Sequence, residues 1–119
     1  MRVLQSFRYA MRGIRTAYRE ERQMKIHTAM AALAVGCGMI ADLSRAEWAI
    51  LILTIAFVIA LELVNTAAER IVDLVTEDYH PLAEKAKDVA AGAVLVASAA
   101  AVIVGICLFS TRVIEWIGG

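Results

Sequence analysis

A group of polar residues interrupts an apolar segment near the middle of the chain. The stretch LELVNTAAERIVDLV, residues 61–75, carries Glu62, Asn65, Glu69 and Asp73. On a helix that turns 100° per residue, these four side chains fall within about 80° of one another. Carboxylates and an amide accept protons, hold divalent cations and orient hydroxyl groups. The sequence therefore predicts a polar site along one face of this helix.

Glu62 lies deepest in the apolar segment, because it directly follows WAILILTIAFVIAL. An ionisable side chain at the centre of a membrane costs about 2.5 kcal/mol or more, so Glu62 should face the protein interior or a polar cavity. A general base and a structural hydrogen-bonding group both satisfy this condition. Asn65, one turn away, is either a group that orients a polar ligand or a contact between helices.

Two apolar segments are long enough to cross a membrane. A third, residues 28–41, is short for a span, but Lys25 and His27 can snorkel and lengthen it. Of the 119 residues, 61% are hydrophobic and 20% are charged, which is more apolar than an ordinary soluble domain. We expect an all-α membrane protein with a single domain over residues 1–119. Its transmembrane helices are predicted at 26–41, 48–70 and 89–111. Two cysteines, Cys37 and Cys107, lie in apolar runs without metal or redox spacing and are expected to be buried and inert.

Residues 1–25 form a different kind of segment, with an apolar stripe beside an arginine stripe. The two stripes consist of Phe7, Met11, Ile14, Tyr18 and Met24, and of Arg8, Arg12, Arg15, Arg19 and Arg22. This pattern is typical of an amphipathic helix that lies in the membrane interface. Glu21 falls within the apolar stripe and should face a group that needs a carboxylate. Glu20 falls on the far side and is expected to be solvated.

The basic residues also predict the orientation. Seven of the twelve Lys and Arg residues precede His27. Because positive residues collect on the cytoplasmic side of a membrane, the N-terminus is expected to be cytoplasmic and the C-terminus extracytoplasmic. Trp48 and Trp116 then lie at the outer interface. The polar connection before the third span lies on the cytoplasmic side, close to Glu69 and Lys87.

Phosphoryl transfer from a nucleotide to a lipid alcohol fits this arrangement. A triphosphate needs a divalent metal, held by carboxylates such as Glu21 and Glu69, and a nearby cation such as Lys87. The base for a lipid hydroxyl must lie at the membrane boundary, where Glu62 is expected. Neither GxxxxGK[ST] nor GxGxxG occurs, which excludes the phosphate-binding loops of soluble nucleotide folds. A small ion- or proton-conducting subunit also uses buried carboxylates and remains an alternative.

Two longer motifs sharpen this interpretation. ELVNTAAERIVDL and EDYHPLAEKAKDVAAGAVL resemble the small prokaryotic integral-membrane kinases of the diacylglycerol kinase and undecaprenol kinase family, and GIRTAYREERQMKIH extends the likeness over nearly the whole chain. The resemblance implies an N-terminal surface helix, three transmembrane helices and a homotrimer with active sites between subunits. It implies ATP, Mg²⁺, membrane lipids and a lipid alcohol as partners, no nucleic acid, and a multi-pass location in the bacterial plasma membrane.

The resemblance also implies a role for each polar residue. Glu62 matches the catalytic base, and Asn65 matches an amide beside the hydroxyl of the lipid substrate. Glu21 and Glu69 match the carboxylates that hold the metal and ATP. The remaining implied nucleotide contacts are Tyr9, Tyr79, His80, Lys87 and Asp88.

Some of these residues have a plainer interpretation. Tyr79 and His80 can simply cap a loop, and Tyr9 can anchor a helix in the interface. Asp73 lies on the face of the site but is equally suited to a structural ion pair. These alternatives remain open from the sequence.

The choice of lipid rests on the branch of the family. Pro81 and the stretch DVAAGAVL look like the Gram-positive branch, which phosphorylates undecaprenol. The proteobacterial branch tends to carry a serine where this chain has Ala90, Ala91 and Gly92. We therefore expect undecaprenol as the acceptor, with diacylglycerol as the alternative.

Small residues recur every four positions in the last span, at Ala93, Ala97, Ala101 and Gly105. Such a stripe lets helices approach closely. It predicts either an oligomer interface or close packing within the chain.

Overall fold

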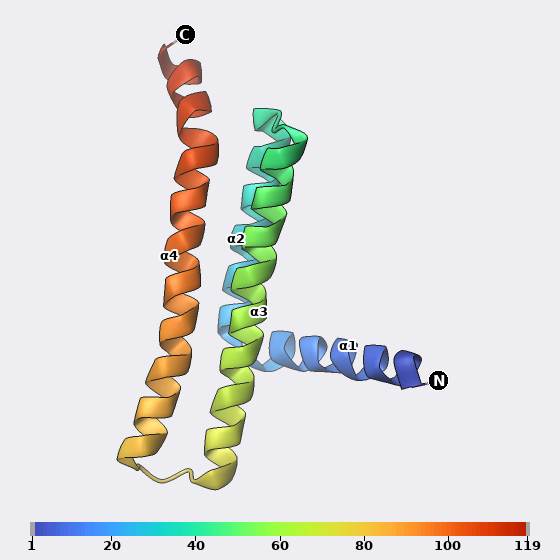
Figure 1. Ribbon diagram of the computed structural model, residues 1–119, viewed down its shortest axis with the longest axis vertical. Coiled ribbons are helices and arrows are strands. Elements are labelled where there is room, and N and C mark those ends of the chain that lie inside the picture. Colours follow the sequence, from blue (N-terminus) through green and yellow to red (C-terminus); the bar gives the residue numbers. More distant parts are fainter. Residues whose placement is uncertain (1, 119) are drawn as a thin grey trace.

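A computed structural model describes residues 2–118, which are all helical apart from short connections. The four helices are α1 (Arg2–Glu20), α2 (Arg22–Ala41), α3 (Arg45–Val75) and α4 (Pro81–Gly118). In Figure 1, α2, α3 and α4 run alongside one another and α1 projects sideways from them. Helices α2, α3 and α4 are long and apolar enough to cross a membrane. The predicted all-helical class with three candidate spans is therefore confirmed.

The helices extend beyond the apolar stretches from which the spans were predicted. Helix α3 continues through the polar residues after position 70 to Val75, and α4 already begins at Pro81. Proline suits the first helical position because no backbone N–H is needed there. The chain bends at Glu21, whose φ of −111° and ψ of 116° are extended, so residues 1–25 contain α1 and also the first turn of α2.

The turn between α2 and α3 is fixed by a capping box and by one residue of α4. Ser44 Oγ accepts a hydrogen bond from Glu47 N at 3.2 Å, and Ser44 N donates to the Glu47 carboxylate at 3.0 Å. From α4, Arg112 Nε donates to the Ala41 carbonyl at 2.9 Å and Nη2 donates to Glu47 at 2.8 Å. Arg112 therefore joins the end of α2, the start of α3 and the C-terminal part of α4.

Helix α3 packs against both α2 and α4, whereas α2 and α4 contact each other little. The buried apolar cluster consists of Ala41, Leu43, Leu51 and Leu108 and lies near the turn between α2 and α3. Most large apolar side chains of the three long helices are exposed instead, including Leu53, Phe57 and Ile103. The two cysteines are exposed as well, so the expectation that their thiols are buried is wrong within one chain. This distribution fits helices whose surrounding solvent is hydrocarbon rather than water.

The stripe of small residues in α4 contributes to packing within the chain. Ala97 is 1% exposed, in the helix that lies along α3, which supports the intrachain interpretation at this position. Ala101 and Gly105 line a groove that is described below, and Ala93 is exposed.

Gly38 allows the ring of Trp48 to lie against α2. A Cβ atom at Gly38 would lie 2.9 Å from Trp48 Cη2 and 3.0 Å from Leu43 Cδ1. Both distances are shorter than an ordinary van der Waals contact, so the indole would have to move away from α2. At Gly36, two residues earlier on the same helix, a Cβ atom would meet nothing within 4 Å.

These two glycines give a matched test of the α2–α3 contact. We expect Gly38→Ala to lower the thermal midpoint of the detergent-solubilised protein, since overpacking typically costs roughly 1–3 kcal/mol. Gly36→Ala should leave the midpoint unchanged or raise it slightly, because alanine favours helix. Equal midpoints for the two variants would contradict the Trp48 contact.

Candidate active site

The Glu62 carboxylate is buried between helices. Glu62 is 3% exposed, and its Oε2 atom lies 3.4 Å from His27 Nε2 of α2. The expectation that Glu62 faces the protein interior is therefore met within a single chain. The partner comes from the neighbouring helix, as a polar group at this depth requires.

Asn65 and Glu69 continue the polar face toward the end of α3. Asn65 Nδ2 donates to Glu69 Oε1 at 3.2 Å. Asn65 Oδ1 is buried and has no hydrogen-bond partner among the described residues, and the same holds for the hydroxyl of Thr66. A buried acceptor without a donor is costly, so the site favours a ligand that brings a hydroxyl or amide N–H to Asn65.

Arg70 brings the two glutamates at the α1–α2 corner to α3. Arg70 Nη2 lies 3.0 Å from Glu21 Oε1 and 3.1 Å from Glu20 Oε2. The expectation that Glu21 faces a specific group is met. Glu20 is exposed, as expected, and its half-exposed side chain also contacts the same guanidinium, which the sequence did not predict.

Asp73 and Lys87 join the C-terminal end of α3 to the N-terminal part of α4, beyond the apolar stretches. Lys87 Nζ donates to Asp73 Oδ1 at 2.7 Å. The hydrogen bond with Asp73 and the charges of Asp73 and Glu69 raise the pKa of Lys87, so it stays protonated at neutral pH. The ion-pair interpretation of Asp73 is supported, and Lys87 is within electrostatic reach of Glu69.

A small cleft of about 240 Å³ lies beside the loop between α3 and α4. It is lined by Tyr79, His80, Lys87 and Asp88, which are four of the predicted nucleotide contacts. His80 Nδ1 also accepts a hydrogen bond from Leu82 N at 3.1 Å, so this ring caps the start of α4, as the plainer interpretation requires.

Tyr9 does not join these residues. It lies on α1 and is 61% exposed. The guanidinium of Arg12 lies over its ring, 5.6 Å from the ring centre. Tyr9 is not among the residues that line the cleft. Within one chain, the predicted nucleotide role of Tyr9 therefore receives no support.

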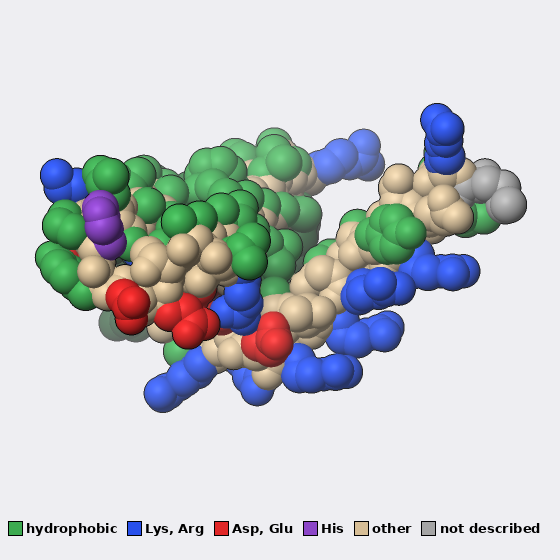
Figure 2. Space-filling model, turned by 90° about the horizontal axis from the view of Figure 1, so that it is seen from below, with side chains coloured by type: hydrophobic (Ala, Val, Ile, Leu, Met, Phe, Trp, Pro, Cys, Tyr) green, Lys and Arg blue, Asp and Glu red, His purple; other side chains and the backbone are tan. Residues whose placement is uncertain are grey.

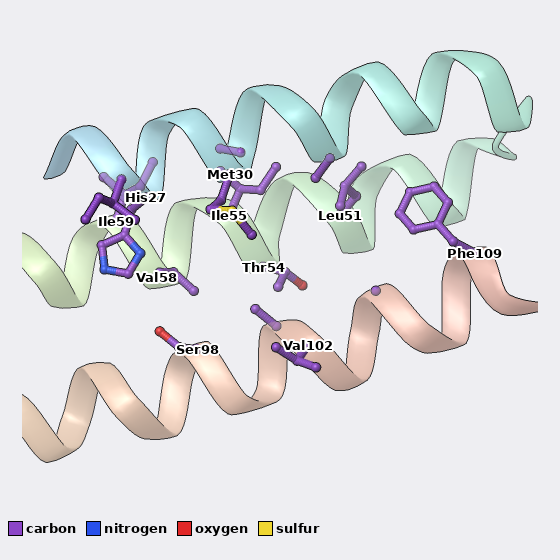
Figure 3. Close-up of a pocket in the computed structure, with 15 residues that line it drawn as sticks. His27, Met30, Leu51, Thr54, Ile55, Val58, Ile59, Ser98, Val102 and Phe109 are labelled. Carbon is purple, nitrogen blue, oxygen red and sulfur yellow. The ribbon is translucent and has the colours of Figure 1, made fainter. Parts of the chain in front are cut away.

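An apolar groove of about 420 Å³ lies where α2 and α4 diverge over α3. Figure 3 shows Met30 of α2, Thr54 and Val58 of α3, and Val102 of α4 along its walls. His27 lies at the end of this groove and also contacts Glu62, so the groove adjoins the buried carboxylate. A groove of this composition suits a hydrocarbon chain.

The charged groups cluster at the end of the molecule seen in Figure 2. Acidic side chains gather where the bundle meets α1, and basic side chains follow the length of α1. An acidic cluster beside a basic helix provides ligands for a cation and a surface for anionic groups.

Sequence reasoning missed two residues of this site, His27 and Arg70. Their own helices give no sign of their contacts, because His27 meets Glu62 across 35 positions and Arg70 meets Glu20 across 50. The one signal in the sequence is that His27 is a polar residue at the start of an apolar span.

A model of the prokaryotic diacylglycerol kinase family matches residues 8–109. The chain belongs to this family. A protein of Bacillus subtilis named undecaprenol kinase is 45% identical over 108 residues, which cover 91% of this chain and 88% of that protein. A diacylglycerol kinase of Synechocystis is 48% identical over 107 residues, which cover 89% of this chain and 61% of that protein. A diacylglycerol kinase of Escherichia coli is 31% identical over 102 residues, or 86% of this chain and 84% of that protein.

Family membership confirms the resemblance drawn from ELVNTAAERIVDL and the motif that follows it. Together with three candidate membrane spans, it favours a membrane lipid kinase over an ion-conducting subunit. The names of the relatives divide between two lipid acceptors, undecaprenol and diacylglycerol.

Proposed function

We propose that this protein is a membrane lipid kinase that transfers the γ-phosphoryl group of ATP to a lipid alcohol, with undecaprenol as the preferred acceptor. The observation that carries this proposal is the buried Glu62 carboxylate, one helical turn from the buried amide of Asn65. Glu62 offers a proton acceptor to the single hydrogen of a hydroxyl group. The Asn65 amide has a second N–H besides the one donated to Glu69, and this N–H can donate to the oxygen of the same hydroxyl. The groove that adjoins them at His27 suits the hydrocarbon part of the same molecule.

The reaction follows from these positions. The lipid hydroxyl binds between Glu62 and Asn65, and Glu62 takes its proton as the oxygen bonds to the γ-phosphorus of ATP. The bond between that phosphorus and the bridging oxygen breaks, and ADP leaves with the electron pair. The product is the lipid phosphate, with the transferred proton on Glu62.

The nucleotide occupies the polar end of the same face. Glu69 lies two helical turns from Glu62, about 10 Å by helix rise, so a triphosphate can extend from the cleft toward the base. Lys87 then contacts its phosphates, while Tyr79, His80 and Asp88 surround the rest of the nucleotide. The Asp73–Lys87 pair is partly exposed and screened by water, so its release costs little.

Glu21 and Glu69 are proposed to hold Mg²⁺ with the phosphates. Magnesium bound with a nucleotide typically takes one or two carboxylates and completes its shell with phosphate oxygens and water. Because the described residues contain no cluster of three or more metal-ligating side chains, phosphate oxygens and water would have to complete the shell. The ion would neutralise charge on the phosphates during transfer. Glu21 is held by Arg70 until then.

The membrane arrangement follows the charges. We propose that α1 lies in the cytoplasmic interface, with the arginines toward headgroups and the exposed Phe7 and Met11 toward lipid. The N-terminus is then cytoplasmic and the C-terminus extracytoplasmic, in the bacterial plasma membrane. The homotrimer implied by the resemblance would let Tyr9, on the projecting α1, reach the nucleotide of a neighbouring protomer.

The lipid preference rests on one contrast. Diacylglycerol carries ester carbonyls that seek hydrogen-bond donors near the interface, and this chain has Ala90, Ala91 and Gly92 where the other branch offers a hydroxyl. An unpaired buried carbonyl costs on the order of 1–3 kcal/mol, which corresponds to roughly 5- to 150-fold in specificity. Undecaprenol has no ester group and avoids this cost.

A direct assay tests the function. We expect purified protein in mixed micelles with Mg²⁺ to consume ATP only when a lipid alcohol is added. The kcat/KM should be higher for undecaprenol than for a long-chain diacylglycerol. A better rate with diacylglycerol would contradict the lipid preference alone, whereas ATP consumption that is independent of either lipid would contradict the kinase assignment.

Glu62→Gln tests the base. The amide keeps the volume but cannot accept the hydroxyl proton, so kcat should fall by roughly 10²-fold or more while the KM for ATP changes little. Glu115→Gln, an exposed change in α4 beyond the predicted span at 89–111, serves as the control and should retain normal turnover. Near-normal kcat for Glu62→Gln would remove Glu62 from this role.

Glu20 and Glu21 give a matched test of the metal site, because both contact Arg70. Glu21→Gln should raise the Mg²⁺ concentration needed for half-maximal activity at least about tenfold, since an ionised ligand is lost. Glu20→Gln removes only a half-exposed ion pair and should change this Mg²⁺ concentration less than twofold. Equal effects would show that the Arg70 contact, rather than metal binding, explains the loss.

A further inference from the structure

His27 occupies a position that the roles above leave unused. His27 belongs to α2, whereas the proposed base Glu62 and the proposed metal ligand Glu69 belong to α3. Its Nε2 atom lies 3.4 Å from Glu62 Oε2, and the two side chains are 16% and 4% exposed. A largely buried histidine that faces a buried carboxylate across two helices is a strong candidate for a functional contact.

The contact distinguishes the two oxygens of the Glu62 carboxylate. His27 engages Oε2, so Oε1 is the oxygen that remains for the hydroxyl of the acceptor. An imidazole Nε2 carries a hydrogen in the charged form and in one neutral tautomer, so both forms place a polar N–H group near Oε2. The amide of Asn65, one turn from Glu62, donates from Nδ2 to Glu69 instead.

The surroundings of His27 add a second argument. The ring projects from α2 into the space between the helices, close to Val58 and Ile59, and forms part of the groove wall (Figure 3). It therefore stands where the apolar groove ends and the polar face of α3 begins. A lipid whose chain follows this groove would bring its head past His27 to Glu62.

We propose that His27 is a positioning residue, which holds the Glu62 carboxylate through Oε2 so that Oε1 points at the acceptor hydroxyl. This proposal rests on the proposed function, because it assumes that Glu62 is the base. A general base must lie within hydrogen-bond reach of the proton it takes, and small misplacements of reacting groups reduce rates strongly. Without His27, the Glu62 side chain would be free to choose other rotamers.

Two substitutions at His27 and one control test the proposal in the full-length protein. His27→Leu removes the donor and should lower kcat by roughly 10- to 100-fold with little change in the KM for ATP. His27→Gln keeps an amide N–H near Oε2 and should restore part of the lost kcat. Thr28→Val is the control: it removes a hydrogen bond with Tyr18 between α1 and α2 and should lower the thermal midpoint while kcat stays near normal.

A double-mutant cycle separates positioning from an independent role. If His27 acts through Glu62, then His27→Leu should have no further effect on kcat in the Glu62→Gln background. Equal losses in both backgrounds, or a normal kcat in His27→Leu when Glu62→Gln is impaired, would contradict this proposal alone. Normal turnover of Glu62→Gln itself would contradict the base assignment and this proposal with it.

Discussion

A carboxylate that is buried among apolar helices needs polar groups around it. Because Glu62 is buried, the neighbouring helices must be placed so that a polar side chain contacts it. Helix α3 carries Glu62 at its buried face, and α2 supplies His27 to meet it. The path of α2 is in turn held by the capped turn at Ser44 and by Arg112 of α4. The far end of the bundle therefore helps to place the group on which the proposed chemistry depends.

The length of α3 gives the site its shape. Its 31 residues span about 46 Å, which is longer than the roughly 30 Å of a hydrocarbon core. One helix can therefore present Glu62 within the membrane boundary and Asp73 beyond it. In the proposed mechanism, the acceptor hydroxyl and the phosphates approach the same face from opposite ends. A small protein without a soluble nucleotide-binding fold can join a lipid and a nucleotide in this way.

Ion pairs occupy the polar end of the site in the free protein. Arg70 neutralises Glu21, and Asp73 neutralises Lys87. Both pairs are partly exposed, so water already screens them and their exchange for a metal ion or phosphates costs little. The buried end differs, because the His27–Glu62 contact is nearly enclosed and Asn65 keeps an unpartnered oxygen. The site is thus adaptable where the nucleotide is proposed to bind and fixed where the proton is proposed to move.

The sequence by itself determined the helical class, the three candidate spans and the polar face of α3. Hydropathy and the 100° helical turn depend only on neighbouring residues, so Glu62, Asn65 and Glu69 were placed on one face without a structure. The motifs also identified the family. The tertiary structure alone decided which groups meet these side chains. His27 contacts Glu62, and Arg70 contacts both Glu20 and Glu21, through contacts between helices whose relative rotation no local pattern encodes. For the same reason the contact of Glu20 with Arg70 was not predicted: the exposed position of Glu20 on α1 could be calculated, but the approach of α3 to that corner could not.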